Sequence, residues 1–128
     1  MERNLTIYFT SDTHGYFSPI NYAAGEHADT GLANCMASFR NDGNVLVMDG
    51  GDTLQGSPFT YYLHKNGIVN PCVPAQVMNC AGYDFVTLGN HDFNYGPDHL
   101  RRYLRSVDAR CLCANVSGLD GVTDTAVV

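Results

Sequence analysis

Three short apolar runs in this sequence each end in polar residues of kinds that bind metals. The runs cover residues 5–10, 45–48 and 84–88. Runs of this length, bounded by glycine or polar turns, are typical of buried strands. Segments with helical spacing of apolar residues lie between them, which predicts a βαβ series with a largely parallel sheet. The predicted fold class is therefore α/β.

The remaining elements follow from the same periodicities. Residues 16–30 form a long irregular loop by pattern, and loops of that length are often functional. The other expected elements are helices over residues 31–40, 59–65, 74–80 and 97–106, a strand over residues 110–116, and the start of a further strand within residues 123–128.

Length and composition favour one small globular domain over residues 1–128. Hydrophobic residues make up 45% of the chain and charged residues 16%. The net charge of −6, with only 7 Lys and Arg, argues against a partner such as a nucleic-acid duplex. No apolar run approaches the roughly 18 residues of a membrane span.

The polar residues after the three runs form a candidate metal site. Asp12 and His14 follow the first run, Asp52 follows the second, and Asn90 and His91 follow the third. The carboxyl ends of parallel strands share one edge, where α/β proteins bind ligands. A mixed oxygen and nitrogen set suits Zn, Mn, Fe or Ni better than calcium. Taken singly, each residue is more often a turn residue or helix cap than a ligand.

Other polar residues carry weaker signals. Asp49 is either a support for the site or an ordinary strand-end acid. His27, His64 and His99 have no partner ligands nearby in the sequence and are expected at the surface. The 5 cysteines have no disulfide-like or zinc-like spacing. Three of them are expected in the core as small apolar residues: Cys35, Cys72 and Cys80.

The strand-end residues carry a family resemblance. Asp12-Thr13-His14, Gly51-Asp52 and Gly89-Asn90-His91-Asp92 match in order the first three motifs of the calcineurin-like metallophosphoesterases. The resemblance covers nearly the whole chain and implies the amino-terminal half of a four-layer αββα sandwich with two divalent metal ions, drawn from Mn, Zn, Fe, Ni or Co.

The same resemblance implies a role for each site residue. Asp12 and His14 would bind the first metal, Asp52 would bridge the two metals, and Asn90 would bind the second. His91 would contact the phosphate and assist the leaving group, and Asp92 beside it is the second candidate catalytic residue. The expected reaction is attack on phosphorus by a hydroxide that the two metals activate.

Two further strings, residues 52–58 and residues 90–96, resemble the 5'-nucleotidase and 2',3'-cyclic-nucleotide phosphodiesterase branch. That branch commonly has Asp at the position of Asn94 in 5'-nucleotidases and Asn in cyclic phosphodiesterases. The resemblance therefore favours 2',3'-cyclic nucleotides and 3'-nucleotides over 5'-monophosphates as substrates. The alternatives are a phosphatase of the same fold with another substrate, and a non-catalytic α/β binding module with a degenerate metal site.

The resemblance also implies parts that residues 1–128 do not contain. The family completes its metal centre with later Gly-His and Gly-His-x-His motifs, and members of this branch add a carboxy-terminal domain whose aromatic residues stack on the base. We therefore expect an amino-terminal part that is inactive by itself, binds metal weakly or binds a single ion, and self-associates or exchanges segments between copies. Its compartment is cytoplasmic if Met1 is native, and extracytoplasmic if a signal was removed.

Overall fold

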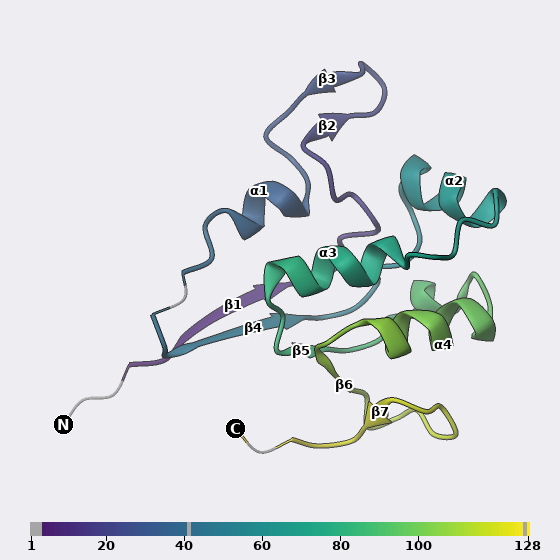
Figure 1. Ribbon diagram of the computed structural model, residues 1–128. Coiled ribbons are helices and arrows are strands. Elements are labelled where there is room, and N and C mark those ends of the chain that lie inside the picture. The colour runs from purple at the N-terminus through teal and green to yellow at the C-terminus, as the bar shows by residue number, and fades with distance from the viewer. Residues whose placement is uncertain (1–3, 41, 127) are drawn as a thin grey trace.

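The computed structural model describes residues 4–40, 42–126 and 128. Its five-stranded sheet is parallel throughout, as the sequence predicted, with the strand order β1-β4-β5-β6-β7 (Figure 1). The strands of this sheet are β1 (Thr6–Thr10), β4 (Val45–Asp49), β5 (Phe85–Val86), β6 (Arg110–Leu112) and β7 (Val122–Thr123). The helices are α1 (Leu32–Met36), α2 (Pro58–Lys65), α3 (Val73–Ala81), α4 (Pro97–Ser106) and the 3₁₀ turn η1 (Asn90–Phe93).

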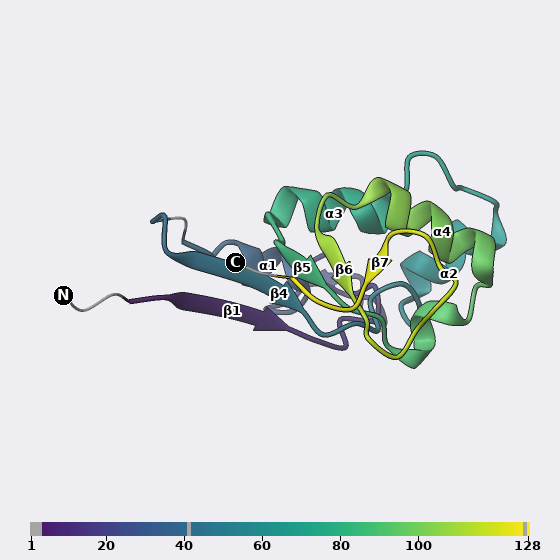
Figure 2. The same ribbon diagram turned by 90° about the horizontal axis from the view of Figure 1, so that it is seen from below.

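Helices α1, α3 and α4 lie against one face of the sheet, and the strand order explains why (Figure 1). The strands advance across the sheet in the order of the sequence. Each right-handed crossover in the same direction places its helix on the same face. Val47 of β4, Val86 of β5 and Cys111 of β6 point into this face and join one buried core with the helices. Figure 2 shows the strands on one side of the molecule and α3 and α4 on the other.

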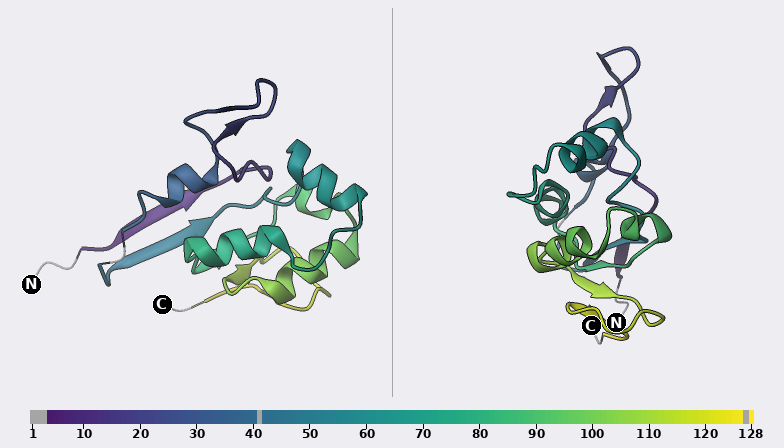
Figure 3. Two further views of the ribbon diagram at one scale, coloured as in Figure 1. Left: turned by 45° about the horizontal axis from the view of Figure 1, so that its top comes forward. Right: turned by 90° about the vertical axis from the view of Figure 1, so that its right-hand side faces the viewer.

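The opposite face of the sheet is open, and it is apolar across β1, β4 and β5. Ile7 and Phe9 on β1 are 55% and 64% exposed. Phe9 pairs in register with Met48 of β4, and Met48 pairs with Phe85 of β5, so these three side chains lie on the same face. Among the described residues this face has no helix layer over it (Figure 3). In the described part of the chain, the five-stranded sheet therefore has a helix layer on one face alone (Figure 3).

The open face bears on the predicted self-association, which stays a prediction. We expect the sedimentation coefficient of the 128-residue chain to rise with protein concentration, since exposed apolar sheet surface favours association. Replacing Phe9 with Thr keeps a good strand residue, removes an exposed ring and should weaken the association. The matched control is Tyr61→Thr, an exposed ring on α2. A wild-type chain that stays monomeric at all concentrations would contradict this prediction.

Several element boundaries differ from the sequence prediction. The helix expected over residues 31–40 ends at Met36, and residues 37–39 form single turns. Ser38 accounts for part of this, because its hydroxyl donates to the carbonyl of Cys35 (2.7 Å) and competes with helix hydrogen bonds. Residues 16–30 are not irregular throughout, since they contain an antiparallel hairpin of β2 (Ile20–Asn21) and β3 (Glu26–His27).

The cysteines are all free thiols, and their positions partly correct the prediction. Cys35 and Cys80 are exposed, so their assignment to the core was wrong, and Cys72 is partly buried. The short α1 turns only Leu32 and Met36 toward the core, which leaves Cys35 outside. Cys111 and Cys113 are the buried pair, on β6 and just after it.

His99 also lies deeper than predicted, whereas His27 and His64 are exposed as expected. The ring of Tyr95 stacks on His64 (centroids 4.0 Å apart) and meets the edge of His99 (5.2 Å). This three-ring stack joins α2, the loop after η1 and the first turns of α4. The Nε2 atom of His99 is buried and has no hydrogen-bond partner among the described residues. Packing against α2, which local sequence cannot reveal, accounts for the difference.

The burial of His99 predicts that acid destabilises the fold. Burial, then the nearby His64 and Arg102, hold the pKa of His99 below 6.5. Just below pH 6.5, the unfolded chain therefore binds a proton at His99 that the folded chain does not bind. The free energy of unfolding should be greatest above about pH 6.5 and should fall as the pH drops from about 6.5 toward the folded-state pKa.

Urea unfolding between about pH 7.5 and 5.5 tests this prediction. His99→Gln should flatten the dependence on pH, whereas His27→Gln, a control on the exposed hairpin, should leave it unchanged. Equal slopes in wild type and His99→Gln would show that another group is responsible.

Candidate metal and phosphoester site

The loops that follow β1 and β4 are joined side by side at the carboxyl edge of the sheet. The backbone N–H of Asp12 donates to the carbonyl of Gly51 (2.9 Å), and the N–H of His14 donates to the carbonyl of Asp52 (2.8 Å). These bonds continue the pairing of two parallel strands past their ends. They fix the relative positions of Asp12, His14 and Asp52.

Two glycines let the loop after β5 approach the loop after β4. Gly51 has φ 91°, and a Cβ there would collide with the backbone nitrogen of Gly89. A Cβ on Gly89 would in turn collide with Oδ1 of Asp52. The absence of a Cβ at both positions therefore permits this close packing of the two loops.

Asp12, His14 and Asp52 form a cluster that fits a metal ion. One potential ligand atom from each residue lies within 4.8 Å of the others. All three have left-handed backbones, with φ of 55°, 49° and 57°, and they are the only such non-glycine residues in the described part of the chain. This conformation is costly for residues with a Cβ and gathers at functional sites. The strain therefore supports a functional role for all three residues.

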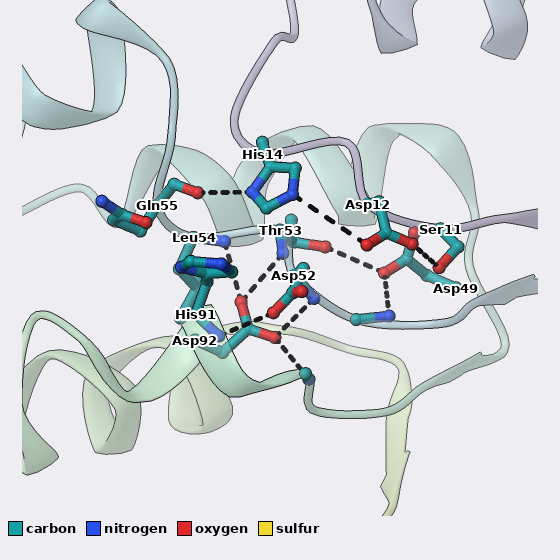
Figure 4. Close-up of polar contacts among 12 residues, drawn as sticks. Ser11, Asp12, His14, Asp49, Asp52, Thr53, Leu54, Gln55, His91 and Asp92 are labelled. Carbon is teal, nitrogen blue, oxygen red and sulfur yellow. Dashed lines mark hydrogen bonds and ion pairs between the residues drawn. The ribbon is translucent and has the colours of Figure 1, made fainter.

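The hydrogen bonding of His14 suits a metal ligand. Nδ1 of His14 lies 2.9 Å from the carbonyl oxygen of Gln55, so Nδ1 carries the proton and donates it (Figure 4). The lone pair of Nε2 then remains available, and this atom faces Oδ1 of Asp12 at 4.0 Å. Metal-binding histidines commonly donate their other N–H in this way. The role of Gln55 was not predictable from the sequence, because a backbone carbonyl leaves no signal in side-chain identity.

His91 lies beside this cluster. Its ring meets that of His14 edge to face, with centroids 5.2 Å apart. Its backbone N–H donates to Oδ1 of Asp52 (2.7 Å). Asn90, the residue before it, is exposed at the start of η1. The third loop thus reaches the other two, and His91 joins Asp12, His14 and Asp52 at this edge of the sheet.

Asp92 does not face the cluster in the way that a direct catalytic role would require. It is buried, 2% exposed. Its carboxylate accepts hydrogen bonds at 2.8–2.9 Å from four backbone N–H groups. The donors are Asp52, Thr53, Leu54 and Gly89. We therefore revise its expected role from catalysis to positioning, since it binds the loop after β4 to the loop after β5.

The side chain of Asn94, and not that of Asp92, hydrogen bonds to the ring of His91. Its Nδ2 lies 2.9 Å from Nδ1 of His91. Because an amide NH₂ can only donate, Nδ1 accepts and the ring proton lies on Nε2. His91 can therefore offer a neutral N–H donor to a ligand in front of the cluster.

A buried polar network supports the site from beneath. Asp49 is 4% exposed, and its carboxylate accepts hydrogen bonds from Thr10 Oγ1 (2.5 Å), Thr53 Oγ1 (2.8 Å) and the N–H of Gly51 (2.9 Å). Burial raises the pKa of Asp49, and these three hydrogen bonds oppose the rise. Tyr83 Oη lies 2.6 Å from Thr10 Oγ1, and burial raises the pKa of Tyr83 to about 12. Asp49 therefore supports the loop, the first of the two roles considered for it.

Comparison with known proteins identifies the family. A family model described as calcineurin-like phosphoesterase matches residues 5–124. The chain belongs to this family. The calcineurin-like phosphoesterases use divalent metals, in agreement with the cluster of Asp12, His14 and Asp52.

Two relatives of this chain have names that describe activity on nucleotides. The trifunctional nucleotide phosphoesterase protein YfkN of Bacillus subtilis is 34% identical over 131 residues, covering 92% of this chain and 9% of YfkN. The 2',3'-cyclic-nucleotide 2'-phosphodiesterase/3'-nucleotidase of Haemophilus influenzae is 30% identical over 122 residues, covering 88% of this chain and 18% of that protein. This chain therefore spans less than a fifth of either relative.

Solved calcineurin-like structures share the fold. The crystal structure of YfkN matches with a TM-score of 0.80 at 32% identity, covering 94% of this chain and 39% of that one. The 5'-nucleotidase precursor of Thermus thermophilus matches with a TM-score of 0.66 at 30% identity, covering 87% of this chain and 22% of that one. Within the described residues, no helix is both long enough and apolar enough to cross a membrane.

Proposed function

We propose that this chain is the amino-terminal part of a metal-dependent phosphoesterase that hydrolyses nucleotide phosphoesters. The observation that carries the proposal is the convergence of Asp12, His14 and Asp52, all three held in left-handed backbone conformations. Relatives named as nucleotide phosphoesterases support the substrate class. The later histidine motifs of the family would then come from residues outside 1–128.

Each cluster residue has a proposed role as a ligand. Asp12 and His14 would hold one cation, Asp52 would bridge to a second, and Asn90 would contact the second. Divalent cations, when bound, polarise phosphoryl oxygens and activate the attacking water. Asp52 is fixed for this role, because His91 donates to one of its carboxylate oxygens and Asp92 holds its backbone.

His91 would act on the phosphoryl group as a donor. Its Nε2–H is directed by the contact between Nδ1 and Asn94. A fixed donor that is aimed at developing negative charge stabilises the transition state. Because Asn94 is neutral, the ring is oriented without a carboxylate, which is the arrangement that the resemblance associates with cyclic phosphodiesterases. We therefore propose that 2',3'-cyclic nucleotides and 3'-nucleotides are preferred to 5'-monophosphates.

A direct comparison of substrates tests this proposal. The complete protein, supplied with Mn²⁺, should hydrolyse 2',3'-cAMP with a higher kcat/KM than 5'-AMP. Asn94→Asp should narrow this ratio, because it gives His91 the partner typical of 5'-nucleotidases. A strong preference for 5'-AMP would reverse the proposed specificity, and no hydrolysis of either nucleotide would contradict the proposed function.

A further inference from the structure

A short segment after β4, residues 55–57, fixes the position of His14 without belonging to the candidate ligand set. His14 has a left-handed backbone (φ 49°), a conformation that persists in residues with a Cβ only where the surroundings hold it in place. Nδ1 of its ring donates to the carbonyl of Gln55 (2.9 Å), and its own carbonyl accepts from the backbone N–H of Ser57 (2.7 Å) (Figure 4). The ring and the backbone of His14 are therefore both bound to this segment.

Gly56, which lies between these two contacts, packs directly against His14. Its φ is 147°, and a Cβ at this position would lie 2.6 Å from the Cβ of His14. Two carbon atoms cannot approach so closely without a shift of one of the two segments. The absence of a side chain at Gly56 therefore lets the segment lie against His14 along its whole length.

The side chain of Ser57 joins the segment to the turn that carries His14. Ser57 is fully buried (0% exposed) and is the N-cap of α2, where its Oγ accepts from the N–H of Thr60 (3.1 Å). The same hydroxyl donates to the carbonyl of Gly15 (2.7 Å), 42 positions earlier in the chain. An N-cap needs only the first of these bonds. The second bond holds the residue after His14 against the start of α2.

The packing between Gly15 and Thr60 shows how closely the turn and the helix fit. Gly15 has φ 72°, and a Cβ there would collide with the side chain of Thr60. Both residues are buried, so removing the hydroxyl of Ser57 would leave the carbonyl of Gly15 and the N–H of Thr60 without that partner. Leaving buried polar groups unpaired costs free energy. A shift of the turn would relieve this cost, and the turn carries His14.

We propose that Ser57 is a positioning residue of the metal site, whose hydroxyl keeps His14 in place to share a metal ion with Asp12 and Asp52. The inference rests on the proposed function, because it takes this cluster as a metal site. Ser57 acts through the backbone of residues 14 and 15 and is not itself a ligand. Groups that orient a metal ligand commonly change metal affinity about 10–100-fold when they are lost. The hydroxyl of Ser57 therefore sets the metal affinity of the His14 site.

Titration of the complete protein with Mn²⁺ in the absence of substrate tests this role, with the free ion measured by electron paramagnetic resonance. Ser57→Ala should raise the dissociation constant for Mn²⁺ about tenfold or more. Ser57→Gly should do the same and should keep the fold, because glycine caps helices nearly as well as serine. Ser57→Thr keeps the hydroxyl and should bind Mn²⁺ nearly as wild type does. Unchanged binding in the Ala and Gly variants, or equal weakening in all three variants, would overturn the proposal.

Asn79→Ala is the matched control for a general loss of stability. The side chain of Asn79 donates to the carbonyl of Ser106 (2.9 Å) and accepts from the N–H of Asp108 (2.8 Å), so it joins α3 to the end of α4 away from the site. This variant should lower the thermal midpoint and leave the dissociation constant for Mn²⁺ unchanged. A rise in that constant equal to the rise in Ser57→Ala would show that lost stability alone weakens metal binding, and would overturn the proposal.

Kinetics of the same variants separate positioning from catalysis. For Ser57→Ala, the Mn²⁺ concentration that gives half the maximal rate on 2',3'-cAMP should rise about tenfold, while kcat at saturating Mn²⁺ stays near wild type. A kcat that stays low at saturating Mn²⁺ would overturn a role through metal affinity. Weaker Mn²⁺ binding in a protein that hydrolyses no phosphoester would retain the role of Ser57 and reject the proposed function. Nucleotide hydrolysis with equal Mn²⁺ affinities in wild type and Ser57→Ala would do the reverse.

Discussion

Asp52→Asn in the complete protein should reduce phosphoester hydrolysis below detection and lower the number of bound metal ions, with little effect on folding. Asparagine can still accept the hydrogen bond from the N–H of His91, and the backbone contact with Asp92 does not involve the side chain of residue 52. The lost property is the negative charge that would hold two cations together. Stability should therefore be preserved while catalysis is not.

The experiment measures metal content, kcat and the thermal midpoint for the same preparations. Asp98→Asn is the matched control, since Asp98 is an exposed carboxylate on α4 paired only with Arg101 in the described part of the chain. Turnover and metal content close to wild type in Asp52→Asn would rule out the bridging assignment. Loss of folding in that variant would instead show that the carboxylate has a structural role.

The His91→Asn variant should keep its bound metal, but its rate of phosphoester hydrolysis should fall by a factor of about 10²–10⁴. A positioned acid or electrostatic donor usually contributes that much. Metal should be retained because His91 reaches Asp52 through its backbone N–H, which the substitution leaves in place. If His91 assists the leaving group, esters with a good leaving group, such as a nitrophenyl ester, should lose less than nucleotides.

Parallel assays on nitrophenyl phosphate and 2',3'-cAMP decide this point, with His27→Asn as a control on the exposed hairpin. Equal losses on the two substrates would argue that His91 contacts the phosphoryl oxygens without donating a proton. Loss of metal from His91→Asn would place the residue among the metal ligands and contradict its assignment as a donor.

The sequence predicted the sheet and placed the candidate site at the carboxyl edge of that sheet, because both features depend on local pattern. The runs that end before Asp12, Asp52 and Asn90 identified the three strands, and the rules for parallel sheets placed their ends together. The direction of each side chain within a tight turn was not predictable in this way. Asp92 and Asn94 lie in one turn, and only the three-dimensional fold shows that Asn94 binds His91 while Asp92 binds backbone N–H groups.

The features that were not predicted depend on contacts between segments that are far apart in the sequence. The network of Tyr83, Thr10 and Asp49 joins β1, β4 and the segment before β5, and no local pattern links residues so far apart. The burial of His99 depends on how α2 meets α4, and the end of α1 depends in part on a single hydroxyl at Ser38. Helical periodicity alone could not supply these contacts.

The left-handed backbones at positions 12, 14 and 52 have a consequence for the history of this fold. Most residues with a Cβ are costly in that conformation, whereas glycine has no steric cost there and asparagine, aspartate and histidine adopt it more often than other residues. Selection for metal ligands would keep aspartate and histidine at these positions. In a gene copy released from that selection, replacement by glycine or asparagine would be tolerated there, so these positions should be among the earliest to record the loss of catalysis.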